Sequence, residues 1–402
     1  MMPAARTPLR RAWLIALTVA ASSAAWGEES WTSIQEEARG QTVYFNAWGG
    51  DAAINRYVSW AGAELKRAHG VNLVLVKVTD IAETVTRIQA EKSAGRSRGG
   101  SVDLMWINGE NFASLKRAGL LFGPWLDDLP NARLLNAADQ TQRLDFALST
   151  DGLEAPWGGA RFTFFYDAEA LAGTPPHNPR ELLTWIRAHP GRFTYPQPPN
   201  FVGSAFLKQL LILLCDRPER LQKPVADDFG DVTRPLWAWL DSAHPKLWRS
   251  GEVFPRSAPE QRRLLGDGEV DWMLAFNPAE AARAIRAGEL QRTVAGLHLE
   301  GGTLANSHFL AIPFNSSAHA GARIVANFLL SPEAQARKAD VEFWGDPTVL
   351  SLNLLNDAQR APFSHATRDA SIPPPPDRLI PEPHATWTPA LERAWAARYG
   401  AR

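Results

Sequence analysis

The residues best suited to bind a small molecule stand in short loops directly after apolar runs. The first such loop, Trp48-Gly49-Gly50-Asp51, follows the β-branched and aromatic run 42–47. Glycines at the start of a helix leave backbone N–H groups open to polar or anionic ligand atoms, and the Trp48 ring can stack on a ligand ring. A tight turn beside a core tryptophan explains the same residues equally well, because tryptophan is usually buried.

The second loop follows the apolar run 102–107 and contains Asn108, Glu110 and Asn111. These residues offer amide donors, acceptors and one carboxylate within four positions. Glu110 has an alternative role in the first turn of its own helix, where a carboxylate is stabilised by the helix dipole. The loop is therefore a second candidate for ligand contact.

The other candidates come from the second half of the chain. Tyr195 precedes a Gly203-Ser204 pair, which can donate hydrogen bonds to a ligand or cap the helix that we expect to start near Ala205. Packing or capping is the alternative role for each of the others, which are Trp157, Phe276, Asn277, Asn306 and Trp344. All candidates fall near the ends of expected strands, as the lining of a shared cleft would.

The motifs of covalent and metal-assisted catalysis are not found in the context that their chemistry needs. The segment Gly95-Arg96-Ser97-Arg98-Gly99 matches Gly-x-Ser-x-Gly, but it lies in a basic, glycine-rich loop that leads into a strand and not at a strand-to-helix turn. The sequence has no His-Glu-x-x-His and no His-x-x-x-His pair, and the five tyrosines are isolated from one another. We therefore expect a binding protein with no cofactor and no metal. A secreted carbohydrate-active hydrolase stays open as the alternative, because the two carboxylates of a glycosidase need not be neighbours in sequence.

The aromatic and acidic residues favour an organic ligand, cationic or aromatic in character. The chain has 16 tryptophans against five tyrosines, which suits stacking on a sugar or on a cationic ring. Asp51, Glu110 and Asp346 can balance a positive charge on such a ligand.

The elements that must position these loops alternate between strands and helices. The runs 42–47, 71–78 and 102–107 read as strands, and Ile54, Val58 and Leu65 recur at helical spacing between the first two. This βαβαβ order with apolar strands predicts a parallel sheet covered by helices. Ligands bind such sheets beyond the carboxyl ends of the strands.

A second α/β set follows the segment 155–159. We expect its strands at 162–166, 192–195 and 270–276, with helices between them. A further strand at 309–313 leads into a helix over 318–330, and Ser331 starts another helix. The fold class is therefore α/β.

The N-terminal residues predict a secretory signal peptide over residues 1–27. Three arginines within the first eleven positions precede an apolar run over 12–20 and then small residues, with cleavage after Ala25 or Gly27. The apolar run is too short to span a bilayer. We expect export to the periplasm and no stable membrane insertion.

Size and charge limit the class of the mature protein. Removal of the leader takes three arginines away and changes the net charge from −1 to −4, which gives no electrostatic reason to bind nucleic acid. The remaining 375 residues of the 402 exceed what one hydrophobic core usually serves, so we expect two lobes. The single cysteine, Cys215, has no disulfide partner, and we expect a monomer.

Several segments, taken in order, resemble those of a known family. They are Ser101–Phe112, Pro156-Trp157-Gly158, Ala311–Asn315 and Ser331–Gln335. The chain resembles the bacterial extracellular solute-binding proteins of ABC importers, in the class that includes thiamine-, polyamine- and maltose-binding proteins. Within that class it is most similar to a branch marked by the first of these segments.

The resemblance implies a two-lobed periplasmic binding protein fold of type II, in which two lobes close over a small-molecule ligand. It also implies delivery to a membrane permease driven by a cytoplasmic ATPase, which must be a separate polypeptide because the chain has no phosphate-binding Gly-x-x-x-x-Gly-Lys loop. A ligand-sensing subunit of a receptor complex would share the fold. The implied segments are lobe 1 at 28–155, a hinge crossover at 156–160, lobe 2 at 161–305, a return crossing with a lobe 1 segment at 306–340, and a C-terminal segment at 341–402 that packs on lobe 2 and the hinge.

Overall fold

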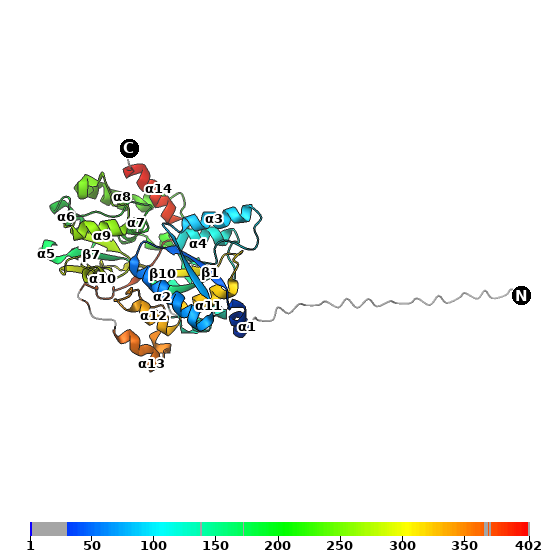
Figure 1. The fold of residues 1–402 in the computed structure, drawn as a ribbon. Coiled ribbons are helices and arrows are strands. Elements are labelled where there is room, and N and C mark those ends of the chain that lie inside the picture. Colours follow the sequence, from blue (N-terminus) through cyan, green and yellow to red (C-terminus); the bar gives the residue numbers. More distant parts are fainter. Residues whose placement is uncertain (2–29, 137–138, 172, 366–368, 370, 401–402) are drawn as a thin grey trace.

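The computed structural model describes residues 1, 30–136, 139–171, 173–365, 369 and 371–400 (Figure 1). The expected signal peptide, with its cleavage positions Ala25 and Gly27, lies outside the described residues. Among the described residues, no helix has the length and apolar character needed to cross a membrane.

The larger sheet contains the expected βαβαβ unit. Strands β1 (Thr42–Trp48), β2 (Asn72–Val78) and β3 (Leu104–Ile107) run parallel, with β1 in the middle. β10 (Thr303–Ala311) continues the sheet antiparallel to β3. The mixed α/β class and the parallel arrangement of the first three strands are confirmed.

Two helix layers cover this sheet, each with its own hydrophobic core (Figure 1). Ile54, Val58 and Leu65 bury one face of α2, and Gly70 ends that helix in the left-handed conformation (φ 69°) that favours glycine. The helices of this layer are α1 (Trp31–Ala38), α2 (Ala52–His69), α11 (His319–Leu329) and α12 (Pro332–Ala339), and those of the other layer are α3 (Ala82–Ser93) and α4 (Gly109–Arg117).

Two paired strands connect this lobe to the next. β6 (Glu154–Arg161) pairs antiparallel with β10 along nearly its whole length. Ala155 and Leu310 lie in the core of the first lobe, whereas Ala160 and Leu304 lie in the core of the second. Each strand thus starts in one core and ends in the other, as a hinge requires.

The second lobe is built on a smaller sheet of β7 (Thr163–Asp167), β8 (Trp272–Ala275) and β9 (Val294–Leu297). The expectation of a mostly parallel sheet does not hold here, because β7 runs antiparallel to both neighbours. β7 follows β6 after a single residue, so its direction is set by the hinge and not by a crossover helix. The helices of this lobe are α5 (Ala168–Leu171), α6 (Pro179–Ala188), α7 (Phe201–Leu214), α8 (Phe229–Ala243), α9 (Ala258–Gly266) and α10 (Glu280–Arg286).

The expected strand at 192–195 is wrong. This segment is extended and its apolar side chains are buried, but it joins no sheet. Its carbonyl groups instead accept single hydrogen bonds: Arg192 O from Asp271 N at 2.9 Å, Phe193 O from Trp248 N at 2.8 Å, and Thr194 O from Gln261 Nε2 at 2.8 Å. The apolar side chains of this segment correctly predicted that it is buried. They could not predict that its backbone bonds to separate groups instead of to a neighbouring strand.

The C-terminal segment divides between the lobes: Trp344, Val349, Leu350 and Leu355 lie in the first-lobe core, and the part from residue 379 onward packs on the second lobe. α14 (Trp387–Tyr399) places Trp387, Leu391 and Trp395 in the core that α7 and α8 share. β11 (Leu379–Pro381) pairs with the second-lobe end of β10. The remaining short elements are the two-residue strands β4 (Leu144–Asp145) and β5 (Leu148–Ser149) and the helix α13 (Asp357–Arg360).

Replacing the buried hinge carboxyl Glu154 by glutamine should stabilise the protein at alkaline pH. Glu154 is fully buried and neither of its oxygens has a hydrogen-bond partner, so burial, together with the nearby Asp145 carboxylate, raises its pKa well above the usual value. Because the folded-state pKa lies above the unfolded-state pKa, the carboxyl causes no loss in the free energy of unfolding below the unfolded-state pKa. That free energy then falls as the pH rises through the folded-state pKa. We expect Glu154→Gln to gain about 1–3 kcal/mol over the wild type at pH 8 and nothing at pH 4.

Denaturant titrations at both pH values measure this difference. The exposed Glu219 provides the control, because Glu219→Gln should follow the wild type at each pH. If Glu154→Gln differs from the wild type by the same free energy of unfolding at pH 4 and pH 8, ionisation of this carboxyl does not destabilise the folded protein.

Candidate functional site

The loop between β1 and α2 presents an accessible tryptophan on a closely packed turn. The Trp48 side chain is 38% exposed. A Cβ atom on Gly50 would lie 2.3 Å from the Trp48 ring, and one on Gly49 would lie 2.6 Å from Cβ of Lys77. Both glycines are thus needed for space. Asp51 ends the loop and caps α2 by accepting hydrogen bonds from Ala53 N at 2.7 Å and Ile54 N at 3.2 Å.

The loop between β3 and α4 presents a carboxylate. The Gly109 N–H donates to both oxygens of Asp145, at 2.9 and 2.8 Å, and this contact fixes the start of α4. Glu110 follows with an exposed side chain, yet the protein atoms around it raise its pKa by burial. A carboxylate that is both accessible and surrounded by protein lies in a concave surface.

Carboxylates from both lobes gather around this point. Glu392 on α14 accepts a hydrogen bond from the Ser204 hydroxyl on α7 at 2.6 Å. Burial raises the pKa of Glu392 to about 7, and the negative charges of Glu110 and Asp80 from the first lobe contribute to the rise. The site therefore concentrates negative charge that few side chains nearby neutralise.

Among the described residues, the cation that lowers the pKa of both Glu110 and Glu392 is Lys208, and it is already paired. Its ammonium group lies 2.6 Å from Glu382 Oε2, and the two side chains are 1% and 2% exposed. The other oxygen of Glu382 accepts from Asn306 Nδ2 at 2.9 Å. The ammonium also lies 4.4 Å from the ring centre of Phe146. This group therefore fixes the hinge strand β10 and the C-terminal segment to α7.

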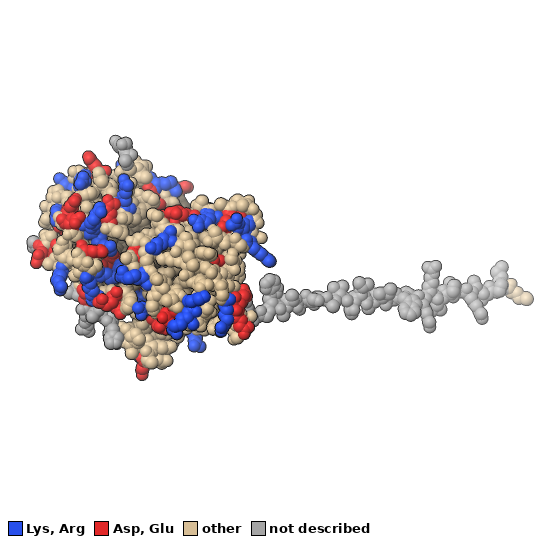
Figure 2. All heavy atoms as spheres, in the orientation of Figure 1, with Lys and Arg blue, Asp and Glu red and all other residues tan. Residues whose placement is uncertain are grey.

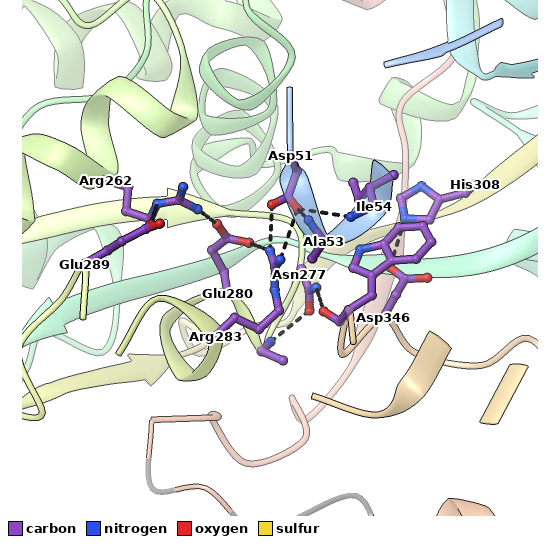
Figure 3. Close-up of polar contacts among 12 residues, drawn as sticks. Asp51, Ala53, Ile54, Arg262, Asn277, Glu280, Arg283, Glu289, His308 and Asp346 are labelled. Carbon is purple, nitrogen blue, oxygen red and sulfur yellow. Dashed lines mark hydrogen bonds and ion pairs between the residues drawn. The ribbon is translucent and has the colours of Figure 1, made fainter. Parts of the chain in front are cut away.

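A chain of ion pairs connects the first lobe to the second (Figure 3). Asp51 receives two hydrogen bonds from the Arg283 guanidinium on α10, at 3.2 and 3.0 Å. Arg283 also pairs with Glu280, which binds Arg262, and Arg262 pairs in turn with Glu289. Although burial raises the pKa of Asp51, the hydrogen bonds and charge of Arg283 keep it below the usual value.

Aromatic rings fill the space between this chain and the hinge. Trp157 is completely buried, with ring centres of Trp106 and Trp344 at 5.2 and 5.4 Å. His308 lies beside them and contacts Asp346 at 3.1 Å, and Asp346 pairs with the buried Lys338 at 2.6 Å. These rings and charged side chains form a buried aromatic cluster beside the hinge strands.

The second lobe contributes an exposed ring. Phe201, the first residue of α7, is 41% exposed, and its ring centre lies 4.9 Å from that of Phe276. α7 starts four residues earlier than the expected Ala205, so Gly203 and Ser204 lie in its first turn. A Cβ atom on Gly203 would lie 1.9 Å from the carbonyl oxygen of Pro196, which explains the glycine by close backbone approach.

The predicted site residues divide into two groups by accessibility. An exposed or half-buried set consists of Trp48, Gly49, Gly50, Asp51, Asn108, Glu110, Asn111 and Asn277. Within it, the Asp51 carboxylate is already paired with Arg283, and the Asn277 amide donates to Trp344 O. A buried set is occupied by protein contacts: Trp157, Tyr195, Gly203, Ser204, Phe276, Asn306 and Trp344. Protein atoms cover the second set, which corrects the expectation that these side chains line an accessible cleft.

Tyr195 lies farthest from the expectation. It is fully buried in the second-lobe core, where its hydroxyl contacts His244 Nε2 and accepts a hydrogen bond from Trp395 Nε1, both at 2.7 Å. Trp157 and Trp344 belong to the first-lobe core, as the alternative of core packing anticipated. Asn277 stands between the lobes, with Nδ2 donating to Trp344 O at 3.0 Å.

Sequence reasoning missed several residues of the site, among them Lys208, Arg283, Glu382 and Glu392. A signal existed for Lys208, a single charge within the apolar helix sequence of α7. Arg283 lies 232 positions from Asp51, and no local pattern connects the two. Their pairing depends on how the lobes fold together.

The chemistry of the site favours binding of an organic molecule. Among the described residues, no group of three or more His, Cys, Asp or Glu side chains is placed to hold a metal ion. Accessible rings and carboxylates remain, and these suit a ligand with a flat or cationic part. On the face shown in Figure 2, basic and acidic side chains are interspersed over both lobes.

Comparisons with known proteins agree in the class that they indicate. The model of a family described as bacterial extracellular solute-binding protein matches residues 60–362. The protein YnjB of Escherichia coli (strain K12) is 46% identical over 390 residues, which cover 96% of this chain and 98% of that one.

Solved structures share the fold at low sequence identity. The periplasmic binding protein AfuA from Actinobacillus pleuropneumoniae, with fructose-6-phosphate bound, has a TM-score of 0.62 at 12% identity, over 90% of this chain and 99% of that one. The spermidine/putrescine substrate-binding protein PotD from Streptococcus pneumoniae has a TM-score of 0.60 at 13% identity, over 89% and 96% of the two chains. The likeness is one of fold.

Removing the positive charge of Lys208 should destabilise the protein strongly. Lys208→Met leaves the buried Glu382 carboxylate without its counter-charge, which typically costs about 3–5 kcal/mol. The double change Lys208→Met with Glu382→Gln removes both charges and should recover much of this loss. Urea unfolding measures both values.

The exposed pair of Arg234 and Asp231 on α8 supplies a matched control. Arg234→Met should change stability by about 0.5 kcal/mol or less, because surface ion pairs contribute little. Equal effects of the two single substitutions would mean that the Lys208 pair is not a buried anchor.

Proposed function

The chain belongs to the bacterial extracellular solute-binding protein family, and we propose from this premise that it captures a small organic ligand between its two lobes for an ABC importer. Membership confirms the resemblance that the order of the sequence motifs indicated. The ligand and its delivery to a permease are the proposal.

One observation supports the place of binding. Accessible side chains come from both lobes: Trp48 and Glu110 follow strand ends of the first lobe, and Phe201 starts α7 in the second. Ligands of parallel α/β sheets bind beyond the carboxyl ends of the strands, which is where the two first-lobe loops lie. A molecule held there touches both lobes and favours their closed arrangement.

The charges support a cationic group on the ligand. Asp80, Glu110 and Glu392 come from both lobes, and the nearby Lys208 is already neutralised by Glu382. Trp48 and Phe201 offer ring faces, which attract cations and stack on flat groups. A ligand with both a positive charge and a ring or apolar part satisfies all of these side chains.

We place the protein in the periplasm as a monomer, after removal of its N-terminal leader. Its partners are a membrane permease and, through the permease, a separate ATPase in the cytoplasm. A carrier binds its ligand stoichiometrically and releases it unchanged, whereas a carbohydrate-active hydrolase would turn over aryl glycosides. Assay of the purified protein with such glycosides separates the two functions.

A thermal-shift screen of the mature protein against organic cations, sugars, amino acids, vitamins and phosphorylated compounds tests the proposal. Binding to the folded state alone adds about 2.7 kcal/mol of stability at a hundredfold excess over Kd. We expect the strongest shifts among organic cations. Shifts confined to anions or to uncharged sugars would contradict the ligand class.

Removing the Glu110 charge should weaken binding of the strongest cationic ligand from that screen. A charge-assisted contact contributes roughly 1.5–3 kcal/mol, so Glu110→Gln should raise Kd by about tenfold or more in calorimetric titrations. Glu83→Gln on the exposed face of α3 serves as the matched control and should leave Kd unchanged. Equal Kd values for the two variants would remove Glu110 from the site.

The pH dependence of binding should follow Glu392. Because its pKa lies at about 7, Glu392 gains a proton as the pH falls from 8 to 6 and loses its attraction for a cation. The Kd for a permanently charged ligand should therefore rise over this range. The Glu392→Gln variant should bind more weakly at pH 8 and show a flatter profile. A wild-type profile that is flat from pH 8 to 6 would argue against contact with Glu392.

A further inference from the structure

The ion pair of Asp51 and Arg283 joins the two lobes (Figure 3). Asp51 follows β1 of the larger sheet, and Arg283 lies on α10, which follows β8 of the smaller sheet. Two nitrogens of the guanidinium meet the two carboxylate oxygens, at 3.2 and 3.0 Å. This two-point geometry is the stronger form of such contacts, and it depends on the relative position of the lobes.

Both partners are held in place before they meet. Asp51 is fixed by its two capping hydrogen bonds to α2, and the Trp48 ring leaves no room for a side chain on Gly50. Arg283 is fixed by Glu280 on the same helix, and Glu280 by Arg262 on α9. Formation of the pair therefore immobilises few additional side chains, which lowers its entropic cost.

The pair can separate without leaving an isolated buried charge. When the lobes part, Asp51 keeps the N–H groups of α2 and Arg283 keeps Glu280. Lys208 and Glu382 differ, because their separation would leave both charges buried and unpaired. Asp51 and Arg283, at 11% and 13% side-chain exposure, are partly accessible to water even when paired. These features describe a contact built to form and break.

We propose that Asp51 and Arg283 form an ionic latch that closes the two lobes in the absence of ligand. The latch lowers the free-energy difference that a ligand must supply, since a ligand binds more tightly when the competent state is already populated. It requires the two-lobed fold alone and does not depend on the class of ligand. Part of the free energy that favours the closed arrangement thus comes from the protein's own side chains.

Distances between the lobes test the latch without any ligand. Spin labels on cysteines introduced at the exposed Ala90 of α3 and Ala188 of α6, in a Cys215→Ser background, report lobe separation by double electron–electron resonance. Asp51→Asn removes the charge and keeps a good helix cap, and Arg283→Met removes the guanidinium. Each should raise the ratio of open to closed molecules by about fivefold to tenfold over the ratio in the unsubstituted labelled protein, as expected for a partly buried two-point pair.

Arg220→Met is the matched control, because it breaks a two-point guanidinium–carboxylate pair with Asp228 inside the second lobe and leaves Asp51, Arg283 and their neighbours untouched. Its distance distribution should match that of the unsubstituted labelled protein, and so should the melting temperatures of all three variants within a few degrees. If Asp51→Asn and Arg283→Met keep the original distance distribution, the latch is overturned. A screen that yields no ligand would count against the proposed function and leave this result unaffected.

Discussion

The pairing of β6 with β10 is the constraint on which the rest of the structure depends. The two strands start in one hydrophobic core and end in the other, so the lobes can rotate about them but cannot move apart. Trp157 on β6 and His308 on β10 are in ring contact, so the aromatic cluster lies on the same pair of strands. Because the hinge fixes this geometry, loops far apart in the sequence face one another across it.

Two kinds of charged contact complement the hinge. Buried pairs such as Lys208 with Glu382, and Lys338 with Asp346, cannot separate without a large cost, and they hold segments permanently together. Asp51 and Arg283 each keep a second partner, so their contact can be broken at little cost. The carboxyls of Glu110 and Glu392 differ from both kinds, because burial raises their pKa and the Lys208 charge that acts on them is shared with Glu382.

Local patterns predicted the first lobe well because its elements follow local rules. The helical spacing of Ile54, Val58 and Leu65 predicted α2, and the glycine at position 70 predicted where it ends. The segment 192–195 was misassigned because its apolar side chains say nothing about which groups bond its backbone. The direction of β7 was also missed, since it depends on the hinge strand that precedes it.

The accessibility of the candidate residues was predictable where loops follow strands, and not where the lobes meet. Trp48 and Glu110 are accessible as expected, because a strand end exposes the next residues. Trp157, Tyr195 and Trp344 have the same residue types, but neighbours distant in sequence cover them. Arg283 could not be connected to Asp51 before the fold was known, since 232 positions separate them.

Hydrogen exchange of backbone amides tests most directly whether a ligand is held between the lobes. Exchange should be compared for the mature protein alone and with the organic cation that stabilises it most. If the ligand contacts both lobes, amides of the Trp48–Asp51 loop in the first lobe and of the first turns of α7 in the second should both exchange more slowly. Slower exchange in one lobe alone, or in neither, would contradict binding between the two lobes.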